Sequence, residues 1–283
     1  MLLVQGRFGF FDCNLFLTAL QNRILLFDGA MGTEIQKYNP KPEDFPNNQD
    51  GFNDGLVITH PDWIKKIHKN YLDAGSDCVE TNSFGSNKIK LDEYGFGDQT
   101  IEFNKKIAQL AVEVCSEYTD KPRYVIGSMG PSGYLPSSND PDLGQKPLGE
   151  IRDAFELQAE GLILGGVDAL LIETSQDILE VKLAIEACHD AMKKTGKKVD
   201  LLVGFFANLI LGNENDNSRP LKIVCGLTED SLWLIDQDSV QAIPLHDLQP
   251  KFDKPQTDSI LNKFEFEFIS SRQKFTIQST DAN

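Results

Sequence analysis

The chain is poor in basic residues, and this shortage limits the partners it can have. Its 283 residues include 27 Lys and Arg against 43 Asp and Glu, which gives a formal net charge of −16 at pH 7. Nucleic acids and anionic membrane surfaces are bound by basic protein faces. We therefore expect no nucleic acid and no membrane among its partners.

Long apolar runs are also missing. A membrane-spanning helix needs about 20 consecutive apolar residues, and no stretch of this sequence approaches that length. The apolar N-terminus is interrupted by Arg7, Asp12 and Asn14 and has no basic segment before it, unlike a secretory signal. We expect a leading helix that covers part of a core, and a cytoplasmic location.

Cysteine and histidine are scarce and scattered. The odd number and wide spacing of the cysteines are typical of a reducing compartment and not of a disulfide framework. The five are Cys13, Cys78, Cys115, Cys188 and Cys225. No two are adjacent, and no pair among the four histidines has metal-ligand spacing.

What the sequence does contain is a regular alternation of short apolar runs and amphipathic segments. The runs predict strands at 24–28, 77–84, 124–130, 168–174 and 201–206. The segments between them predict helices at 61–75, 101–115, 148–164 and 177–196. Such alternation predicts a parallel sheet with crossover helices, covered on both faces because its strands are almost wholly apolar.

Polar residues close several of the predicted strands. They are Asp28, Glu80, Thr81, Asn82, Ser128, Glu173 and Thr174. In a (β/α) barrel the carboxyl ends of the strands form the active site, so these residues predict one shared site. The alternative is that they only cap the helices that follow. The turn at Asp28 and Gly29 also offers a carboxylate and unhindered backbone N–H groups.

The pattern changes after residue 206. A polar linker is predicted over 207–217, and short alternating runs with polar turns over 218–283 are typical of antiparallel strands. The predicted organisation is an N-terminal extension (1–23), a (β/α) portion (24–206), the linker, and a β-rich tail of unknown role.

Five motifs, in order, resemble a known family. They are LLFDGAMGTEIQ, DGFNDGLVITHP, AGSDCVETNSFGSN, VIGSMGPSG and GGVDALLIET. The chain resembles the homocysteine-binding barrel of homocysteine S-methyltransferases over about 24–206, and most of all the N-terminal module of cobalamin-dependent methionine synthases. The resemblance implies an α/β fold of the (β/α)8 TIM-barrel type. We expect a partial barrel of about five parallel strands, followed by a short antiparallel β-rich tail.

The resemblance also implies an activity and a site. The family transfers a methyl group to the sulfur of homocysteine, giving methionine. Asp28 and Glu173 would bind the substrate's amino group. The substrate carboxylate would be held by the backbone N–H groups of Gly29, Ala30 and Met31. The pocket wall would come from Glu80, Thr81 and Asn82.

The expected zinc site has no ligands in this sequence. A free thiol is mostly protonated at neutral pH, and the family activates it with zinc held by three cysteine thiolates. One of those cysteines ends the sixth strand, and the other two form an adjacent pair at the eighth. This chain has no such pair, and only Cys225 lies in its tail. We therefore expect the chain alone to be inactive, with cobalamin and methyltetrahydrofolate bound by other modules.

The tail leaves alternatives open. It is shorter than the about 90 residues that three more strand–helix units require. The tail could pack over the opening, a second copy could close it, or a misjoined reading frame could have supplied the tail. Two functions stay open as well: a homocysteine-binding module that works with a methyl-donor module, or a degenerate barrel that binds a protein partner through a tail resembling PH or PTB domains.

Overall fold

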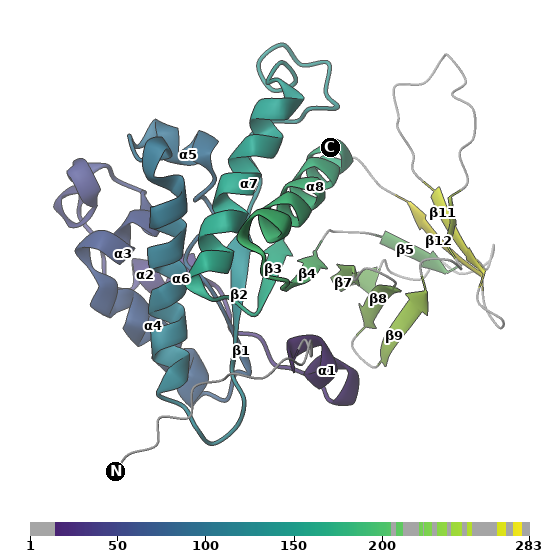
Figure 1. Ribbon diagram of the computed structural model, residues 1–283, viewed down its shortest axis with the longest axis horizontal. Coiled ribbons are helices and arrows are strands. Elements are labelled where there is room, and N and C mark those ends of the chain that lie inside the picture. Colours follow the sequence, from purple (N-terminus) through teal and green to yellow (C-terminus); the bar gives the residue numbers. More distant parts are fainter. Residues whose placement is uncertain are drawn as a thin grey trace.

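The structure is a computed structural model, shown in Figure 1. It describes residues 15–204 and the backbone of eight later strands. Those strands are β5 (Asn208–Leu211), β6 (Leu221–Lys222), β7 (Val224–Leu227), β8 (Ser231–Asp236), β9 (Ser239–Pro244), β10 (Leu248–Pro250), β11 (Glu265–Ile269) and β12 (Lys274–Gln278).

A four-stranded parallel sheet forms the centre of the first part. Its strands are β1 (Cys78–Glu80), β2 (Tyr124–Met129), β3 (Ala169–Ile172) and β4 (Asp200–Val203), in that spatial order. Every neighbouring pair is parallel. The predicted α/β class with a parallel sheet is confirmed.

The first predicted strand is almost absent. Segment 24–28 runs beside β1 but forms only one isolated parallel bridge, Phe27 to Cys78. The Leu26 N–H donates to the Asp77 carboxylate at 2.9 Å instead of to a strand carbonyl. The prediction of a full strand at 24–28 was therefore wrong, because a side chain takes the place of a ladder partner.

The helices cover the sheet much as predicted. They are α1 (Leu15–Asn22), α2 (Met31–Gln36), α3 (Leu56–Thr59), α4 (Pro61–Asp73), α5 (Lys88–Glu93), α6 (Thr100–Ser116), α7 (Leu148–Gly165) and α8 (Ile178–Thr195). Short 3-10 turns are η1 (Pro42–Asp44), η2 (Pro46–Asn48), η3 (Asn53–Gly55) and η4 (Gly97–Gln99). The four long predicted helices are confirmed as α4, α6, α7 and α8.

The start of α8 is capped by Asp177, whose Oδ1 accepts the N–H groups of Leu179 at 2.8 Å and Glu180 at 3.3 Å. The spacing of Asp177 and Glu180 is that of a capping box, but Glu180 does not complete one. Its carboxylate accepts the Ser132 N–H at 2.8 Å and the Ser132 hydroxyl at 2.5 Å, and so anchors the loop after β2. Ser132, which is distant in sequence, has thus taken the place of the backbone N–H that Glu180 would accept in a capping box.

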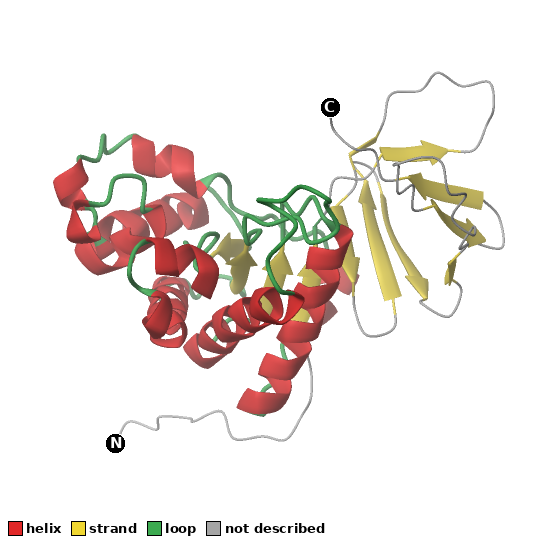
Figure 2. Ribbon diagram, turned by 90° about the horizontal axis from the view of Figure 1, so that it is seen from above, coloured by secondary structure: helices red, strands yellow, loops and turns green. Residues whose placement is uncertain are grey.

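The two faces of the parallel sheet are buried in different ways. The outer face packs on α6, α7 and α8, with Val79, Val125 and Leu170 in one large core. The opposite face, here called the inner face, carries Cys78, Tyr124, Ile126, Ala169, Leu171 and Leu202. Phe16 of α1 packs against that face, its ring 5.4 Å from the Tyr124 ring. Figure 2 shows the helices arranged around the short parallel strands.

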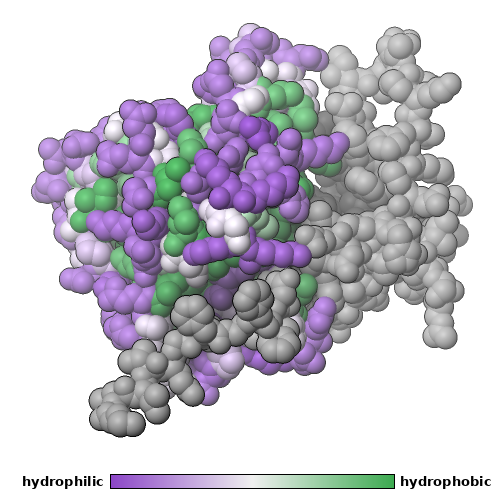
Figure 3. Space-filling view, viewed as in Figure 1, coloured by the Kyte–Doolittle hydropathy of each residue, from purple (hydrophilic) through white to green (hydrophobic). Residues whose placement is uncertain are grey.

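The later strands pair differently from β1–β4. They form antiparallel sheets in the orders β10-β11-β12-β5-β6 and β7-β8-β9. Whether they make a separate module stays a prediction. The linker predicted over 207–217 overlaps β5, and its other residues lie outside the described residues. On the face seen in Figure 3, polar side chains cover most of the described surface. In the part of the chain that the structure describes, no helix is long and apolar enough to cross a membrane.

Candidate functional site

The inner face changes character along its strands. Alternate residues of a strand share a face. Beyond the apolar residues of that face, the next positions toward the carboxyl ends are therefore Glu80, Ser128 and Glu173. The amino end of the face is thus apolar and covered by α1, whereas the carboxyl end carries two acids and a serine hydroxyl.

Asp28 joins this carboxyl end from the segment beside β1. Its two carboxylate oxygens lie 3.1 and 3.2 Å from the Glu80 nitrogen, and the Glu80 N–H donates to them. Burial raises the pKa of Asp28 to about 7, the backbone N–H groups oppose this, and the charge of Glu173 adds to it. Part of the Asp28 population is therefore protonated at neutral pH.

Glu80 and Glu173 complete a group of three acids, here called the carboxylate cluster. Burial raises the pKa of Glu80 to about 8, and the charges of Glu173 and Asp28 raise it further. The Ser128 hydroxyl donates to Glu173 Oε1 at 2.5 Å. No cation is among the causes of the Asp28 and Glu80 shifts. The structure therefore brings together the three predicted acids without a described positive charge to balance them.

The turn after Asp28 presents exposed backbone. Gly29 and Ala30 are exposed, and α2 begins at Met31 with no side chain capping its first N–H groups. A Cβ on Gly29 would lie 3.0 Å from the Tyr71 hydroxyl and 3.2 Å from its ring. A side chain at this position would therefore crowd Tyr71, which would have to move by a few tenths of an ångström to admit it. Tyr71 comes from α4, and the helical spacing of its apolar residues does not mark it as a neighbour of the turn.

Thr81 and Asn82 stand behind the cluster. Both are buried. Thr81 Oγ1 lies 2.6 Å from Ser83 Oγ and accepts the Ser128 N–H at 3.0 Å. The Asn82 amide donates to the Asn53 carbonyl at 3.0 Å. These contacts brace the strand ends, and a direct contact of either residue with substrate stays a prediction.

Ser128 was predicted at the shared strand-end site but without a substrate contact, and Asp54 was not predicted there. Ser128 was visible as the polar end of a strand, and its bond to Glu173 gives it a role. Asp54 is buried, accepts the Ser86 hydroxyl at 2.9 Å, and has its pKa raised to about 6 by burial. It ties the long loop over 38–55 to the loop after β1. The sequence feature that could have pointed to Asp54 is its place as an acid inside the glycine-rich turn DGFNDG.

The described side chains do not fit a zinc site. Cys78 lies at the amino end of β1, and Cys115 and Cys188 lie on helices, all buried. Burial raises the pKa of all three, to about 12 for Cys115 and Cys188, so they stay thiols where zinc needs thiolates. Among the residues that the structure describes, no three His, Cys, Asp or Glu are grouped to hold a metal. The side chains of Cys13 and Cys225 are outside that set.

Comparison with solved structures supports the barrel-type fold. The homocysteine methyltransferase MmuM from Escherichia coli, in its oxidized form, aligns with a TM-score of 0.53 and 22% sequence identity. The alignment covers 67% of this chain and 65% of that chain. The metallated form of the same protein aligns with a TM-score of 0.53 and 21% identity, over 66% and 65%. At this identity the likeness shows the fold.

Comparison of sequences shows the ancestry. The chain is 38% identical over 204 residues to a methionine synthase of Mycobacterium tuberculosis, which is 70% of this chain and 17% of that protein. A methionine synthase of Mycobacterium leprae is 38% identical over 189 residues, which is 66% of this chain and 15% of that protein. The chain thus spans less than a fifth of the length of these relatives.

A family-wide sequence model extends further along the chain than the five motifs. It matches residues 25–219, past residue 206, where the resemblance was expected to end. Its description is homocysteine S-methyltransferase, and it includes all eight predicted site residues. The chain belongs to the homocysteine S-methyltransferase family.

Proposed function

We propose that this chain is a homocysteine-binding module for methyl transfer, in which the carboxylate cluster holds the ammonium group of the amino acid. The observation that carries the proposal is the electrostatic imbalance of the cluster. Burial and mutual repulsion raise the pKa values of Asp28 and Glu80 to about 7 and about 8. A bound cation relieves that repulsion, and a protonated amine can donate to several carboxylates at once.

The other end of the amino acid has a matching partner in the turn. We assign its carboxylate to the backbone N–H groups of Gly29, Ala30 and Met31, because they are not capped by a side chain and face an exposed turn. With the ammonium on the acids and the carboxylate on the turn, the substrate is held in one orientation. Thr81 and Asn82 stabilise the wall behind it.

Activation of the thiol is a separate requirement. Methyl transfer needs a thiolate nucleophile, and in this family zinc supplies it. The described cysteines do not fit that metal, so we assign binding and orientation to this chain and methyl donation to a separate module. We expect no methyl transfer by the chain alone. Elemental analysis that finds about one zinc per chain would contradict this expectation.

A thermal-shift titration with homocysteine and with methionine tests the proposal. Both ligands carry the ammonium and the carboxylate, so both should raise the melting temperature of the full chain. At a ligand concentration of 100 times Kd the expected gain is about 2.7 kcal/mol. Asp28→Asn and Glu173→Gln should abolish the shift, because each removes a charge that faces the ammonium.

Asp120→Asn is the matched control. Asp120 pairs with Arg123 and its side chain is 63% exposed, so its loss removes a carboxylate away from the cluster. The control should shift as the wild type does. No shift with either ligand in the wild type would reject the proposal and favour the alternative of a binding or scaffold protein.

A further inference from the structure

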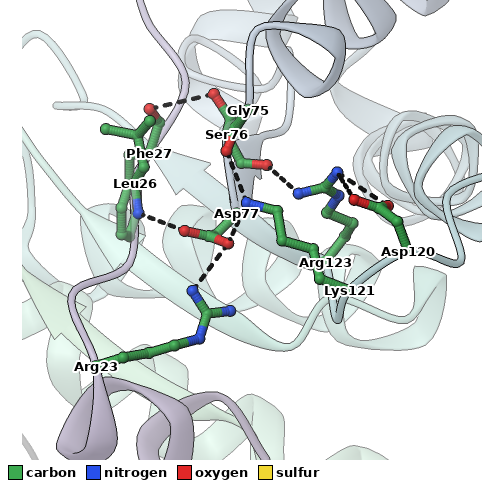
Figure 4. Close-up of polar contacts among 9 residues, drawn as sticks. All are labelled: Arg23, Leu26, Phe27, Gly75, Ser76, Asp77, Asp120, Lys121 and Arg123. Carbon is green, nitrogen blue, oxygen red and sulfur yellow. Dashed lines mark hydrogen bonds and ion pairs between the residues drawn. The ribbon is translucent and has the colours of Figure 1, made fainter.

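A second polar cluster lies at the opposite end of segment 24–28 and is centred on Asp77 (Figure 4). The Asp77 carboxylate accepts the Leu26 N–H at 2.9 Å and forms ion pairs with Arg23 at 2.9 Å and Lys121 at 2.7 Å. Its side chain is only 6% exposed. One buried acid therefore joins three parts of the chain that are far apart in sequence.

Asp77 holds Leu26 through its backbone as well. The Asp77 N–H donates to the Leu26 carbonyl at 2.6 Å, and the Cys78 N–H donates to the same carbonyl at 3.0 Å. Leu26 is thus fixed at both its N–H and its C=O. Two residues further on, the Asp28 N–H donates to the Cys78 carbonyl at 3.0 Å, and the Asp28 carboxylate accepts the Glu80 N–H.

Only part of this segment is held by the burial of apolar side chains. Leu25 is buried, but Ile24 is 83% exposed and Leu26 is 56% exposed. Among the described residues, the segment has a single strand pairing, the bridge at Phe27. The polar contacts of Asp77 are therefore the main device that sets the position of the segment along β1.

We propose that Asp77 is a positioning residue for the carboxylate cluster: by fixing Leu26 against the start of β1, it fixes Asp28 beside Glu80. Two residues of extended chain, about 7 Å, separate the residue that is gripped from the residue that is positioned. Because this link is short, a shift of Leu26 should move Asp28 by a similar distance. The ligand-binding part of this inference rests on the proposed function.

The nearby pair of Arg123 and Asp120 provides a matched comparison. Arg123 donates to the Ser76 carbonyl at 3.0 Å and to both Asp120 oxygens at 3.1 Å. These contacts lie in the same region as the Asp77 cluster (Figure 4) and reach segment 24–28 through Ser76, whose hydroxyl donates to the Phe27 carbonyl at 3.4 Å. Removing the Asp120 carboxylate leaves that bond and every contact of Asp77 in place, so it should disturb this end of the sheet without moving Asp28.

The test follows the Asp28 carboxyl group by carbon-13 NMR titration of the ligand-free full chain, with the resonance assigned from Asp28→Asn. In Asp77→Ala the segment loosens and water reaches Asp28, so its pKa should fall by at least about one unit toward the usual value of about 3.9. Homocysteine affinity should fall about tenfold or more. Asp77→Asn keeps an oxygen that accepts from Leu26 and should retain most of both properties. Asp120→Ala should change neither.

The outcomes separate this inference from the proposed function. A folded Asp77→Ala whose Asp28 titrates as in the wild type overturns the inference. If the wild type does not bind homocysteine, the proposed function fails, and the ligand-free titration still decides the role of Asp77. If Asp77→Ala does not fold, Lys121→Met replaces it. That variant should shift the Asp28 titration in the same direction by less, and an unchanged titration overturns the inference.

Discussion

The two ends of segment 24–28 place acids in opposite electrostatic settings. At the start of β1, Asp77 is buried and balanced by Arg23 and Lys121. At the end of β1, Asp28 and Glu80 are half-buried beside Glu173, and no cation contributes to their pKa shifts. Asp77 immediately precedes β1 and Glu80 is its last residue, so the two settings lie only a few residues apart along the chain.

The difference separates a structural acid from a binding acid. A buried carboxylate that is fully paired contributes to the folded state, and its removal leaves its partners unsatisfied. Partly buried carboxylates that repel one another cost folding free energy, and that cost falls when one of them is protonated or when a cation binds. The carboxyl end of the sheet thus carries unbalanced acids, as the proposed function requires, whereas the acid at the amino end is already paired.

Asp77→Ala should give the largest effect on stability. The substitution leaves Arg23, Lys121 and the Leu26 N–H without their shared acceptor. Because both cations are partly exposed, we expect a loss of about 2–3 kcal/mol in the free energy of unfolding, below the range for a fully buried pair. Urea denaturation at pH 7 measures it.

The control for this effect is Asp120→Ala. Asp120 is largely exposed, so its ion pair with Arg123 should contribute less than about 1 kcal/mol. Equal losses in the two variants would show that Asp77 is no more structural than a surface acid.

Glu80→Gln should have the opposite sign. The pKa of Glu80 is raised from 4.5 to about 8 in the folded protein, so the folded state binds more protons than the unfolded state between these values. Stability of the ligand-free protein therefore falls as pH rises from about 4.5 to about 8. The neutral amide escapes this loss, and we expect a gain of about 1–2 kcal/mol at pH 8.

The pH window for that measurement is set by His68. Burial lowers the pKa of His68 to about 4, so protonation destabilises the fold as pH falls below about 6.5. Denaturation between pH 6.5 and 8.5 avoids this second effect. Glu93→Gln, which removes a surface acid paired with Lys90, should change little. A Glu80→Gln variant less stable than the wild type at pH 8 would contradict the idea of a strained cluster.

Much of the fold could be predicted from local pattern. The alternation of apolar runs and amphipathic segments located β1–β4 and the four long helices, because each element has its own periodicity. Gly196 ends α8 with a φ of +66°, as a glycine stop should. Strand-end position alone was enough to group Asp28, Glu80 and Glu173, since parallel strands bring their carboxyl ends to one edge.

What the sequence could not give depends on contacts between distant residues. Segment 24–28 reads as a strand, but the Asp77 side chain takes the Leu26 N–H that a neighbouring strand would have used. Glu180 reads as a capping residue, but Ser132 occupies its carboxylate. Tyr71 reads as core and lies against Gly29. In each case a tertiary partner overrides the local preference, and spacing carries no sign of it.

Proton release on ligand binding is the smallest predicted effect and the most direct readout of the unbalanced cluster. At pH 7, Asp28 with a pKa of about 7 and Glu80 with a pKa of about 8 together hold more than one proton. An ammonium group lowers both pKa values, so binding should release about one proton. Methionine is the better probe because its thioether has no proton to lose. Titration calorimetry in two buffers of different ionisation enthalpy measures the release, which should fall in Glu80→Gln and persist in Asp120→Asn. Binding of methionine with no proton release would mean that Asp28 and Glu80 are already ionised, and that they do not differ from Asp77 as the structure indicates.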